Sequence, residues 1–473
     1  MKKDAIEFIK NFFRALSANV TRILFTLILT LLLPKILGEQ EYGMWQLYLF
    51  YVTYACYNSF GWSEGIYLKY GGQDYYKLDK KVIAGQVWGL GIYEVLLTFT
   101  VGFFAMTFAP DSMKSYVLML AFLSAGLDNV RYMLQFLLQC TNRIKEYARI
   151  VMVERVLFFS LAILFVLIGS RDYAAFIYSE IVARILSLIY AVYICRDVIF
   201  VKMSSFKELT KEAKYLISCG FKLSFANLAS QLIIGIVRFA VEWEWGTVVF
   251  GKISLTLSMS NMLITCLAAV SVVLFPVLRR MDSEKLKSMY PVMRMVLTVP
   301  LYALLLIYIP FRDILVLWLP QYEASLRYLA ILFPIFIYEV RTTILNNTYL
   351  NTYRKEKYIL YVNVVTVLIS LCITVVTVGL FKSLDLAVAS IVLLVMLKCL
   401  LTEIWLRKIV GGGVLKETLQ ELVLTVVFIV SGWYIGDYRG TAIYAVLYVG
   451  YLLLNKKEIV EKFSHLKSII GAK

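Results

Sequence analysis

The chain has 473 residues, of which 60% are hydrophobic and 17% are charged, and its mean hydropathy is +0.75. These proportions exclude an ordinary water-soluble protein, in which about 45–50% of residues are apolar. The net charge of +16 does not indicate nucleic acid, because the basic residues lie mainly in short gaps between apolar blocks and form no Arg/Gly-rich or aromatic-interleaved tract.

The apolar blocks are about 20 residues long, the length a helix needs to cross a bilayer core of about 30 Å. Residues 1–16 precede them and have the alternating aromatic and basic residues of an interfacial amphipathic helix. In chain order we then predict fourteen spans, at 18–37, 43–66, 82–108, 114–139, 148–169, 173–195, 215–241, 247–275, 289–310, 324–350, 358–380, 385–407, 417–436 and 440–455.

The charges between the spans predict the topology. With the N-terminus placed in the cytoplasm, every inner segment carries more Lys and Arg than any outer loop. This asymmetry is typical of membrane proteins and places both termini in the cytoplasm. Except for 311–323, the outer loops are only a few residues long, which leaves no room for an extracellular catalytic domain.

The spans fall into two groups of six with faint internal similarity. Asp128, Arg131 and Gln135 in the fourth span have the same spacing as Glu339, Thr342 and Asn346 in the tenth. We therefore expect an all-α polytopic membrane protein with two pseudo-symmetric six-helix lobes and two extra C-terminal helices. The predicted parts are an N-terminal lobe (1–195), a cytoplasmic basic linker (196–214), a C-terminal lobe (215–408), the last two spans (409–455) and a cytoplasmic amphipathic tail (456–473).

Three spans carry polar residues along one helical face, which a helix surrounded by lipid would not do. We expect these faces to line a shared water-accessible cavity. They comprise Asn19, Arg22, Thr26 and Thr30 in the first span, Ser124, Asp128, Arg131, Gln135 and Gln139 in the fourth, and Ser224, Asn227, Gln231, Gly235, Arg238 and Glu242 in the seventh.

Charged residues within spans are costly, so each must pair, reach the interface or face a wet cavity. Because the cations outnumber the acids, the cavity should favour an anion, and phosphate suits the planar fork of arginine. The predicted substrate-binding residues are Arg22, Arg131, Arg184, Arg238, Lys252, Arg341, Lys398, Asn19, Gln135, Asn227, Gln231 and Asn346. The candidate ion-coupling carboxylates are Glu64, Glu94, Asp128 and Glu339.

Alternatives remain open for several of these residues. Asp128/Arg131 and Glu180/Arg184 have i,i+3 and i,i+4 spacing and could be self-satisfied structural pairs. Arg238 and Lys252 could be interfacial pairs with the acids near 242–244. Lys222 and Arg294 lie near the expected cytoplasmic ends of their spans, where long side chains extend to the headgroups. Arg341 and Lys398 have no acid at i±3 or i±4 and are stronger cavity candidates.

Motifs for enzymes, metals and nucleotides are not found. The seven cysteines form no C-x-x-C pair, and the single histidine, His465, lies in the polar tail. The stretch 246–252 matches most of a P-loop, but Ile253 stands where a Ser or Thr would bind magnesium. We therefore expect no enzymatic activity, cofactor, metal site or nucleotide, and a transport step driven by an ion gradient, the membrane potential or the substrate gradient.

The stretch 33–46, with Gly38, Tyr42 and Gly43 in a Gly-x-x-x-Tyr-Gly pattern, resembles the bacterial polysaccharide-repeat-unit flippases of the Wzx type. Residues 63–72 are also similar to that family's second span. The family belongs to the multidrug/oligosaccharidyl-lipid/polysaccharide (MOP) exporter superfamily. The resemblance implies two six-helix lobes around a central cationic cavity, in the cytoplasmic membrane of a bacterium. It implies flipping of undecaprenyl-pyrophosphate-linked oligosaccharide by alternating access.

The leading hypothesis is therefore a flippase of lipid-linked repeat units for capsule, exopolysaccharide or O-antigen assembly. Its expected partners are the lipid-linked oligosaccharide and the lipid bilayer, with a polysaccharide polymerase and a chain-length regulator as candidate protein partners. The alternatives are a peptidoglycan lipid-precursor flippase or a multidrug exporter of the same superfamily. A membrane polymerase or acyltransferase is disfavoured, because the chain has neither a large outer loop nor a histidine in a span.

Overall fold

Helices make up almost all of the chain that the computed structural model describes, residues 24–108, 111–279, 283–413 and 415–471. Ten helices in these ranges are long and apolar enough to cross a membrane, and two shorter apolar helices, Leu24–Ile36 and Tyr438–Leu454, accompany them. One long helix, α9 (Phe206–Arg279), covers two predicted spans and is non-helical at Gly246. The predicted fold class, an all-α polytopic membrane protein, is confirmed.

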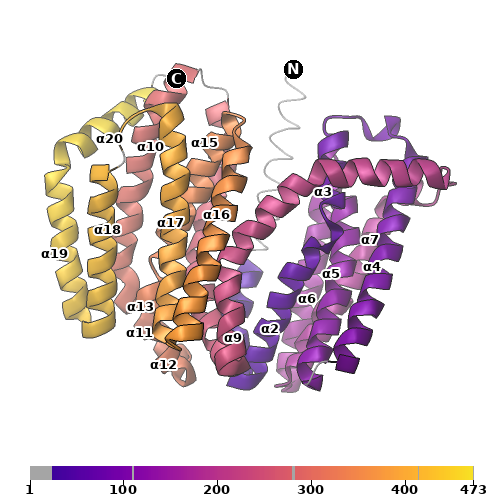
Figure 1. Cartoon of the computed structure of the whole chain (residues 1–473), viewed down its shortest axis with the longest axis horizontal. Coiled ribbons are helices and arrows are strands. Elements are labelled where there is room, and N and C mark those ends of the chain that lie inside the picture. Colours follow the sequence, from indigo (N-terminus) through magenta and orange to yellow (C-terminus); the bar gives the residue numbers. More distant parts are fainter. Residues whose placement is uncertain (1–23, 109–110, 280–282, 414, 472–473) are drawn as a thin grey trace. The chain divides into compact units, whose positions relative to one another are not determined.

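The helices form two compact units, Met1–Leu228 and Ala229–Lys473. Figure 1 colours the chain from indigo at the N-terminus to yellow at the C-terminus. Unit 1 contains the helix Leu24–Ile36, α2 (Glu39–Ala55), η1 (Cys56–Ser59), α3 (Trp62–Tyr70), η2 (Tyr75–Lys77), α4 (Lys80–Phe108), α5 (Ser112–Cys140), α6 (Ile144–Ile168), α7 (Tyr173–Ile194), α8 (Arg196–Ile199) and the first part of α9.

The helix α5 is the centre of unit 1, and α2, α3, α4, α6 and α7 all pack against it. In its most apolar stretch 61% of the residues are buried, a larger share than in any other candidate span of the unit. Asp111 begins α5 and Asp172 begins α7, and each side chain accepts hydrogen bonds from backbone N–H groups of the first helical turn. These two loops thus end in residues that satisfy the free N-terminal ends of α5 and α7.

The second predicted span, 43–66, is not one helix. Between α2 and α3 the chain turns through left-handed residues, Phe60 with φ of 51° and Gly61 with φ of 83°. The reason is close backbone contact, since a Cβ atom on Gly61 would lie 2.5 Å from the carbonyl carbon of Gly220 in α9. Likewise, a Cβ atom on Gly65 would lie 2.1 Å from the carbonyl oxygen of Leu216. The start of α9 therefore lies directly on α3.

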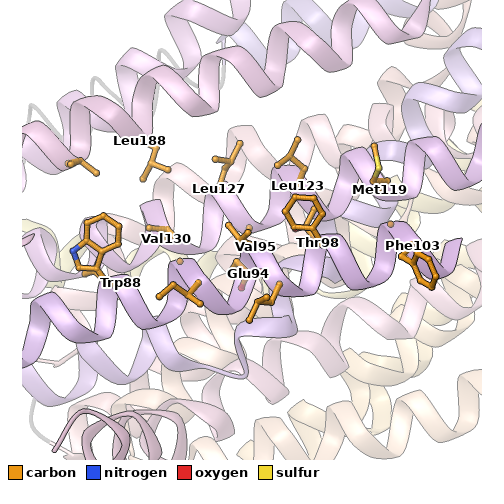
Figure 2. Close-up of a pocket in the computed structure, with 18 of the residues that line it drawn as sticks. Trp88, Glu94, Val95, Thr98, Phe103, Met119, Leu123, Leu127, Val130 and Leu188 are labelled. Carbon is orange, nitrogen blue, oxygen red and sulfur yellow. The ribbon is translucent and has the colours of Figure 1, made fainter. Parts of the chain in front are cut away.

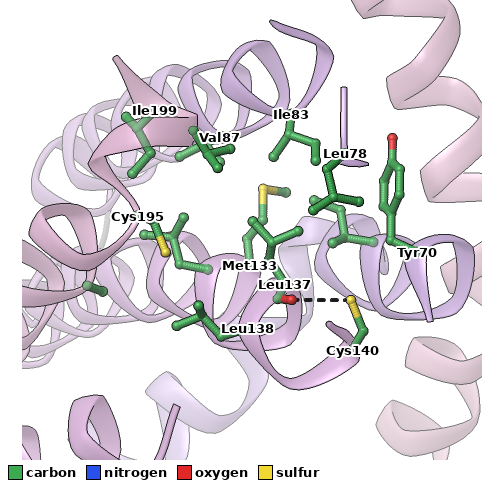
Figure 3. Close-up of a cluster of buried hydrophobic side chains, with 14 of the residues drawn as sticks. Tyr70, Leu78, Ile83, Val87, Met133, Leu137, Leu138, Cys140, Cys195 and Ile199 are labelled. Atoms are coloured by element: carbon green, nitrogen blue, oxygen red, sulfur yellow. Dashed lines mark hydrogen bonds between the residues drawn. The ribbon is translucent and has the colours of Figure 1, made fainter. Parts of the chain in front are cut away.

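A hydrophobic core joins α3, α4, α5, α7 and α8 at one end of unit 1 (Figure 3). It includes Ile83 of α4, Met133 and Leu137 of α5, and two free cysteines, Cys140 and Cys195. The Cys140 thiol donates to the carbonyl oxygen of Leu137 at 3.4 Å. These two cysteines act as small apolar residues, as the sequence predicts.

Unit 2 holds the remaining helices of the chain. It contains the rest of α9, α10 (Ser283–Ala303), η3 (Leu304–Ile307), α11 (Tyr308–Trp318), η4 (Pro320–Tyr322), α12 (Glu323–Leu326), α13 (Leu329–Leu332), α14 (Ile335–Val340), η5 (Arg341–Asn346), α15 (Asn347–Thr352), α16 (Glu356–Thr374), η6 (Val375–Leu380), α17 (Leu384–Val410), α18 (Leu415–Val430), η7 (Ser431–Ile435), α19 (Tyr438–Leu454) and α20 (Lys456–Gly471).

The tenth predicted span, 324–350, corresponds to the succession of short helices from α12 to α15. In the most apolar stretch of Leu329–Thr352, 89% of the residues are buried, the highest share among the candidate spans of the described residues. Pro334 lies between α13 and α14, and the turn η5 has π-helical geometry, which often marks functional sites. The helix α17 packs against α13, α14, η5, α15 and α16.

Candidate functional site

The polar face predicted on the fourth span lies in the interior of unit 1. Ser124, Asp128, Arg131 and Gln135 of α5 are each at most 4% exposed. The Ser124 hydroxyl shares a hydrogen bond of 2.6 Å with the Tyr48 hydroxyl of α2. This face of α5 is therefore enclosed by neighbouring helices of the same unit.

Five charged side chains from α5, α6 and α7 form a buried network, which we call the unit 1 cluster (Asp128, Arg131, Glu154, Glu180 and Arg184). Arg131 lies 2.5 Å from Asp128 and 2.6 Å from Glu154. Arg184 lies 2.6 Å from Glu180 and 3.0 Å from Asp128. Asp128 thus bridges the two arginines, and the intrahelical pairs predicted from spacing are both present.

The charge of the unit 1 cluster differs from the expectation. Its two guanidinium groups face three carboxyl groups, and Arg155, at 30% side-chain exposure, lies 3.8 Å from Glu154. The predicted excess of cations is therefore wrong for these residues. The physical reason is that a buried charge is strongly destabilising unless it is paired, and Glu154 on α6 supplies the additional partner.

Unit 2 holds a second network, the unit 2 cluster (Arg294, Arg341, Glu403, Arg407, Glu417 and Glu421). Arg341 of η5, 1% exposed, lies 3.0 Å from Glu403 of α17 and also binds Glu421 of α18. Arg407 lies 2.7 Å from Glu417 and 3.3 Å from Glu403. Three arginines and three glutamates make this cluster balanced in formal charge.

Arg294 corrects a sequence-based expectation. Its position suggested a side chain that extends to the headgroups, yet it is only 4% exposed. Its guanidinium lies 2.6 Å from Glu403, 3.0 Å from Glu417 and 2.9 Å from Glu421. Three carboxylates from two other helices hold it inside unit 2, which offsets the cost of removing it from water.

Lys398, the other strong cavity candidate, is also paired. Its ammonium lies 3.0 Å from Glu339 of α14 and donates to the Ser230 hydroxyl at 3.1 Å. Asn346, fully buried in η5, accepts a hydrogen bond of 3.1 Å from the Tyr290 hydroxyl. The structure thus brings Arg341, Asn346 and Lys398 into the same interior region around η5 and α17.

The remaining predicted binding residues have different surroundings. Arg238 is half-buried, donates to the Ser254 hydroxyl at 2.9 Å and lies over the Phe250 ring at 5.0 Å. Lys252 is half-buried, whereas Asn227 and Gln231 are exposed. Arg22 and Asn19 lie outside the described residues.

The four candidate coupling carboxylates are not gathered at one place. Glu64 of α3 is half-buried, and one of its carboxylate oxygens is buried without a hydrogen-bond partner. Glu94 of α4 is 4% exposed and accepts a hydrogen bond of 2.7 Å from Asn129. Asp128 belongs to the unit 1 cluster, and Glu339 binds Lys398.

Sequence reasoning missed four members of the unit 2 cluster. Glu403, Arg407, Glu417 and Glu421 lie at or near the predicted ends of spans and were not singled out. A signal was available, because Glu403/Arg407 and Glu417/Glu421 both have i,i+4 spacing and each pair shares a helical face. No sequence signal indicated that α10 and η5 would bring arginines to those faces.

Comparison with known proteins gives a fold but no close relative. No protein-family model matches the sequence, and no curated protein is similar to it in sequence. Among solved structures, lipid II flippase MurJ in an inward closed conformation matches with a TM-score of 0.64 and 11% identity, covering 95% of this chain and 100% of that one.

Two transporters match over a smaller part of the chain. An inward-facing multidrug resistance MATE family transporter of the MOP superfamily has a TM-score of 0.63 and 12% identity, covering 83% of this chain and 98% of that one. A MOP superfamily transporter from Pyrococcus furiosus has a TM-score of 0.55 and 13% identity, covering 85% and 96%. The chain therefore has the fold of MOP superfamily transporters.

Proposed function

We propose that this protein is a flippase that moves undecaprenyl-pyrophosphate-linked oligosaccharide repeat units across the bacterial cytoplasmic membrane by alternating access. The product would serve capsule, exopolysaccharide or O-antigen assembly. In this proposal the protein is a transporter and not an enzyme, both termini are cytoplasmic, and a polymerase and a chain-length regulator receive the flipped unit.

The observation that favours a flippase over a multidrug exporter is the extent of the fold match. The match to the lipid II flippase covers 95% of this chain, whereas the MATE structures cover 83–85%. The unit 2 cluster supports the same distinction, because Glu417 and Glu421 tie α18 to Arg294 of α10. Ion pairs to α10 thus hold α18 within unit 2.

The buried clusters suggest how an anionic headgroup would be handled. Each guanidinium already binds carboxylates, so pyrophosphate reaches Arg131, Arg184 or Arg341 by displacing one of them. The displaced carboxylate must then be neutralised by a proton or a cation, since an uncompensated charge in the membrane interior is costly. This exchange would couple substrate binding to ions through Asp128, with Glu64, Glu94 and Glu339 as further candidates.

Arg22, Arg238, Lys252 and Lys398 remain proposed contacts for the headgroup. Asn19, Gln135, Asn227, Gln231 and Asn346 remain proposed hydrogen-bonding partners of the sugars. Arginine and lysine suit phosphate groups, and amide side chains both donate to and accept from hydroxyl groups. A cationic drug would favour a cavity lined by acids and aromatic rings instead.

Complementation tests this function directly. The gene is expressed in three bacterial strains, one lacking its repeat-unit flippase, one depleted of its peptidoglycan-precursor flippase and one lacking its main drug exporters. We expect surface polymer to return in the first strain, with no rescue of growth in the second or of drug resistance in the third. Rescue confined to the second strain would assign the precursor-flippase alternative, and rescue confined to the third would assign a multidrug exporter.

A further inference from the structure

A long apolar groove runs along unit 1 between α4 and α5, with a volume of about 940 Å³. Its walls extend on α4 from Val87 to Thr107 and on α5 from Met119 to Val130, and Leu188 of α7 and Phe200 also line it. Figure 2 shows Trp88 and Phe103 toward opposite ends of the groove and Glu94 between them. None of the site clusters described above forms its walls.

Glycines give the groove its depth. Gly91, Gly102 and Gly126 all lie in its lining, where larger side chains would fill the space. Gly91 is open toward the groove, since a Cβ atom there would meet only the Val130 side chain, at 4.0 Å. The one acid, Glu94, is 4% exposed and accepts a hydrogen bond from Asn129, so it does not require a polar ligand.

The surroundings of the groove determine what kind of molecule can fill it. In the most apolar stretch of α4 only 22% of the residues are buried within the protein. Phe99, which lies in the groove, is 74% exposed. In a membrane-spanning helix such a surface faces hydrocarbon, and an apolar cavity does not hold water. The occupant is therefore a hydrocarbon chain from the bilayer.

The length of the groove selects among hydrocarbon chains. Trp88 and Thr107 are separated by about 28 Å at 1.5 Å per residue, close to the full bilayer core of about 30 Å. An ordinary acyl chain ends near the bilayer midplane and fills about half of this length. An isoprenoid tail of a polyprenyl lipid is long enough to occupy the groove from end to end.

We propose that this groove binds the isoprenoid tail of the lipid-linked substrate, an inference that rests on the proposed flippase function. The headgroup must pass from one leaflet to the other while the tail stays in lipid. A groove that crosses both leaflets keeps the tail in contact with the same helices at the start and at the end of this movement. Apolar burial along the groove supplies the affinity and requires no specific polar contact.

Photo-crosslinking in proteoliposomes tests the groove. The full chain is prepared with the photoreactive residue p-benzoylphenylalanine in place of Phe99, or in place of Val446 on α19, which is 75% exposed and outside the groove. The vesicles contain phospholipid and radiolabelled undecaprenyl phosphate as the probe. We expect labelling of the protein with the probe residue at position 99 and only background labelling with it at position 446.

A groove-filling variant provides the second measurement. Gly91→Leu adds a side chain in the groove, and we expect crosslinking at position 99 to fall about tenfold, roughly the loss of two methylene contacts. Gly450→Leu on α19 is the matched control, because a Cβ atom at Gly450 meets nothing within 4 Å. This control should leave crosslinking unchanged and shows whether a leucine in an open helical position is tolerated.

Two results would overturn the groove proposal: equal labelling at positions 99 and 446, or capture of phospholipid chains at position 99 without the polyprenyl probe. Both differ from failure of the proposed function, which is read from complementation alone. Restored polymer without crosslinking rejects the groove and leaves the flippase function standing. Crosslinking without rescue of either the first or the second strain rejects the flippase function and leaves a polyprenyl-binding groove.

Discussion

Asp128 is the carboxylate on which the unit 1 cluster depends, because it contacts both Arg131 and Arg184. Replacing Asp128 by Asn leaves two buried guanidinium groups with fewer carboxylates. Arg131 keeps Glu154 and Arg184 keeps Glu180, so the variant weakens two charge-assisted contacts, each worth about 1.5–3 kcal/mol, without leaving either guanidinium unpaired. We expect Asp128→Asn to lower the thermal unfolding temperature of the purified protein, and to reduce surface polymer at matched expression.

Arg155→Gln is the matched control for this prediction. Arg155 approaches the same cluster at 3.8 Å from Glu154, but its side chain is 30% exposed. Exposed ion pairs contribute about 0–1 kcal/mol, so this variant should unfold near the wild-type temperature. An Asp128→Asn protein as stable as the control would show that the cluster does not need its bridging carboxylate.

For individual residues, the sequence predicted ion pairs within one helix and missed ion pairs between helices. Asp128/Arg131 and Glu180/Arg184 were identifiable because helical geometry places residues three or four apart on one face. The partners of Arg341 are Glu403 and Glu421, which lie on α17 and α18 far along the chain. Without the packing of these helices, Arg341 looks unpaired, and the sequence therefore suggested more free cations than the described residues contain.

Among the elements, the contact between α3 and α9 depends on glycine. A Cβ atom on Gly220 would lie 1.9 Å from the carbonyl oxygen of Gly61, a distance that the two backbones cannot accommodate without moving apart. We expect Gly220→Ala to destabilise the protein by about 1–3 kcal/mol, the usual cost of overpacking. Thermal unfolding of the purified variant measures the change.

Gly450→Ala is the matched control for Gly220→Ala. Gly450 lies within α19 with open space around its Cα, so alanine should be neutral or stabilise the helix by up to about 1 kcal/mol. If both alanine variants unfolded at the same temperature, the close approach of α9 to α3 would not exist in the membrane protein.

The elements themselves were largely predictable, and their interruptions were not. Apolar block length predicts where a helix can cross the membrane, which is why α4, α5, α6 and α7 agree with the predicted third to sixth spans. It carries no information on backbone dihedral angles or on backbone contacts. The break at Gly61 and the division of the tenth predicted span around Pro334 therefore appeared only in the structure.

In the whole molecule, each unit has a buried central segment with a fully enclosed arginine. The fourth predicted span carries Arg131 and the tenth carries Arg341, and both side chains are 1% exposed. Each arginine binds two carboxylates, at least one of them from a neighbouring helix. Both units thus hold a buried arginine between carboxylates, although the predicted register of the two spans pairs Arg131 with Thr342 and not with Arg341.

The unit 2 cluster predicts how the last helices are held. The sequence suggested that the final two spans are extra helices outside the two lobes, and Glu421 of α18 lies 2.9 Å from Arg294 of α10. We expect Arg294→Gln and Glu421→Gln each to cost about 3–5 kcal/mol, because each leaves the formally balanced unit 2 cluster with one uncompensated buried charge. The double variant should cost less than the sum by about 0.5–3 kcal/mol, the coupling typical of residues in contact.

A surface pair in the same unit calibrates this cycle. Lys382 and Glu244 are 2.9 Å apart, but the lysine side chain is 66% exposed, so Lys382→Gln and Glu244→Gln should be additive within about 1 kcal/mol. Thermal unfolding of the two sets of single and double variants gives both coupling energies. Equal coupling in the two pairs would mean that α18 is held by apolar packing alone. A larger coupling for Arg294 and Glu421 would mean that the C-terminal helices unfold together with the interior of unit 2, because they share its buried charges.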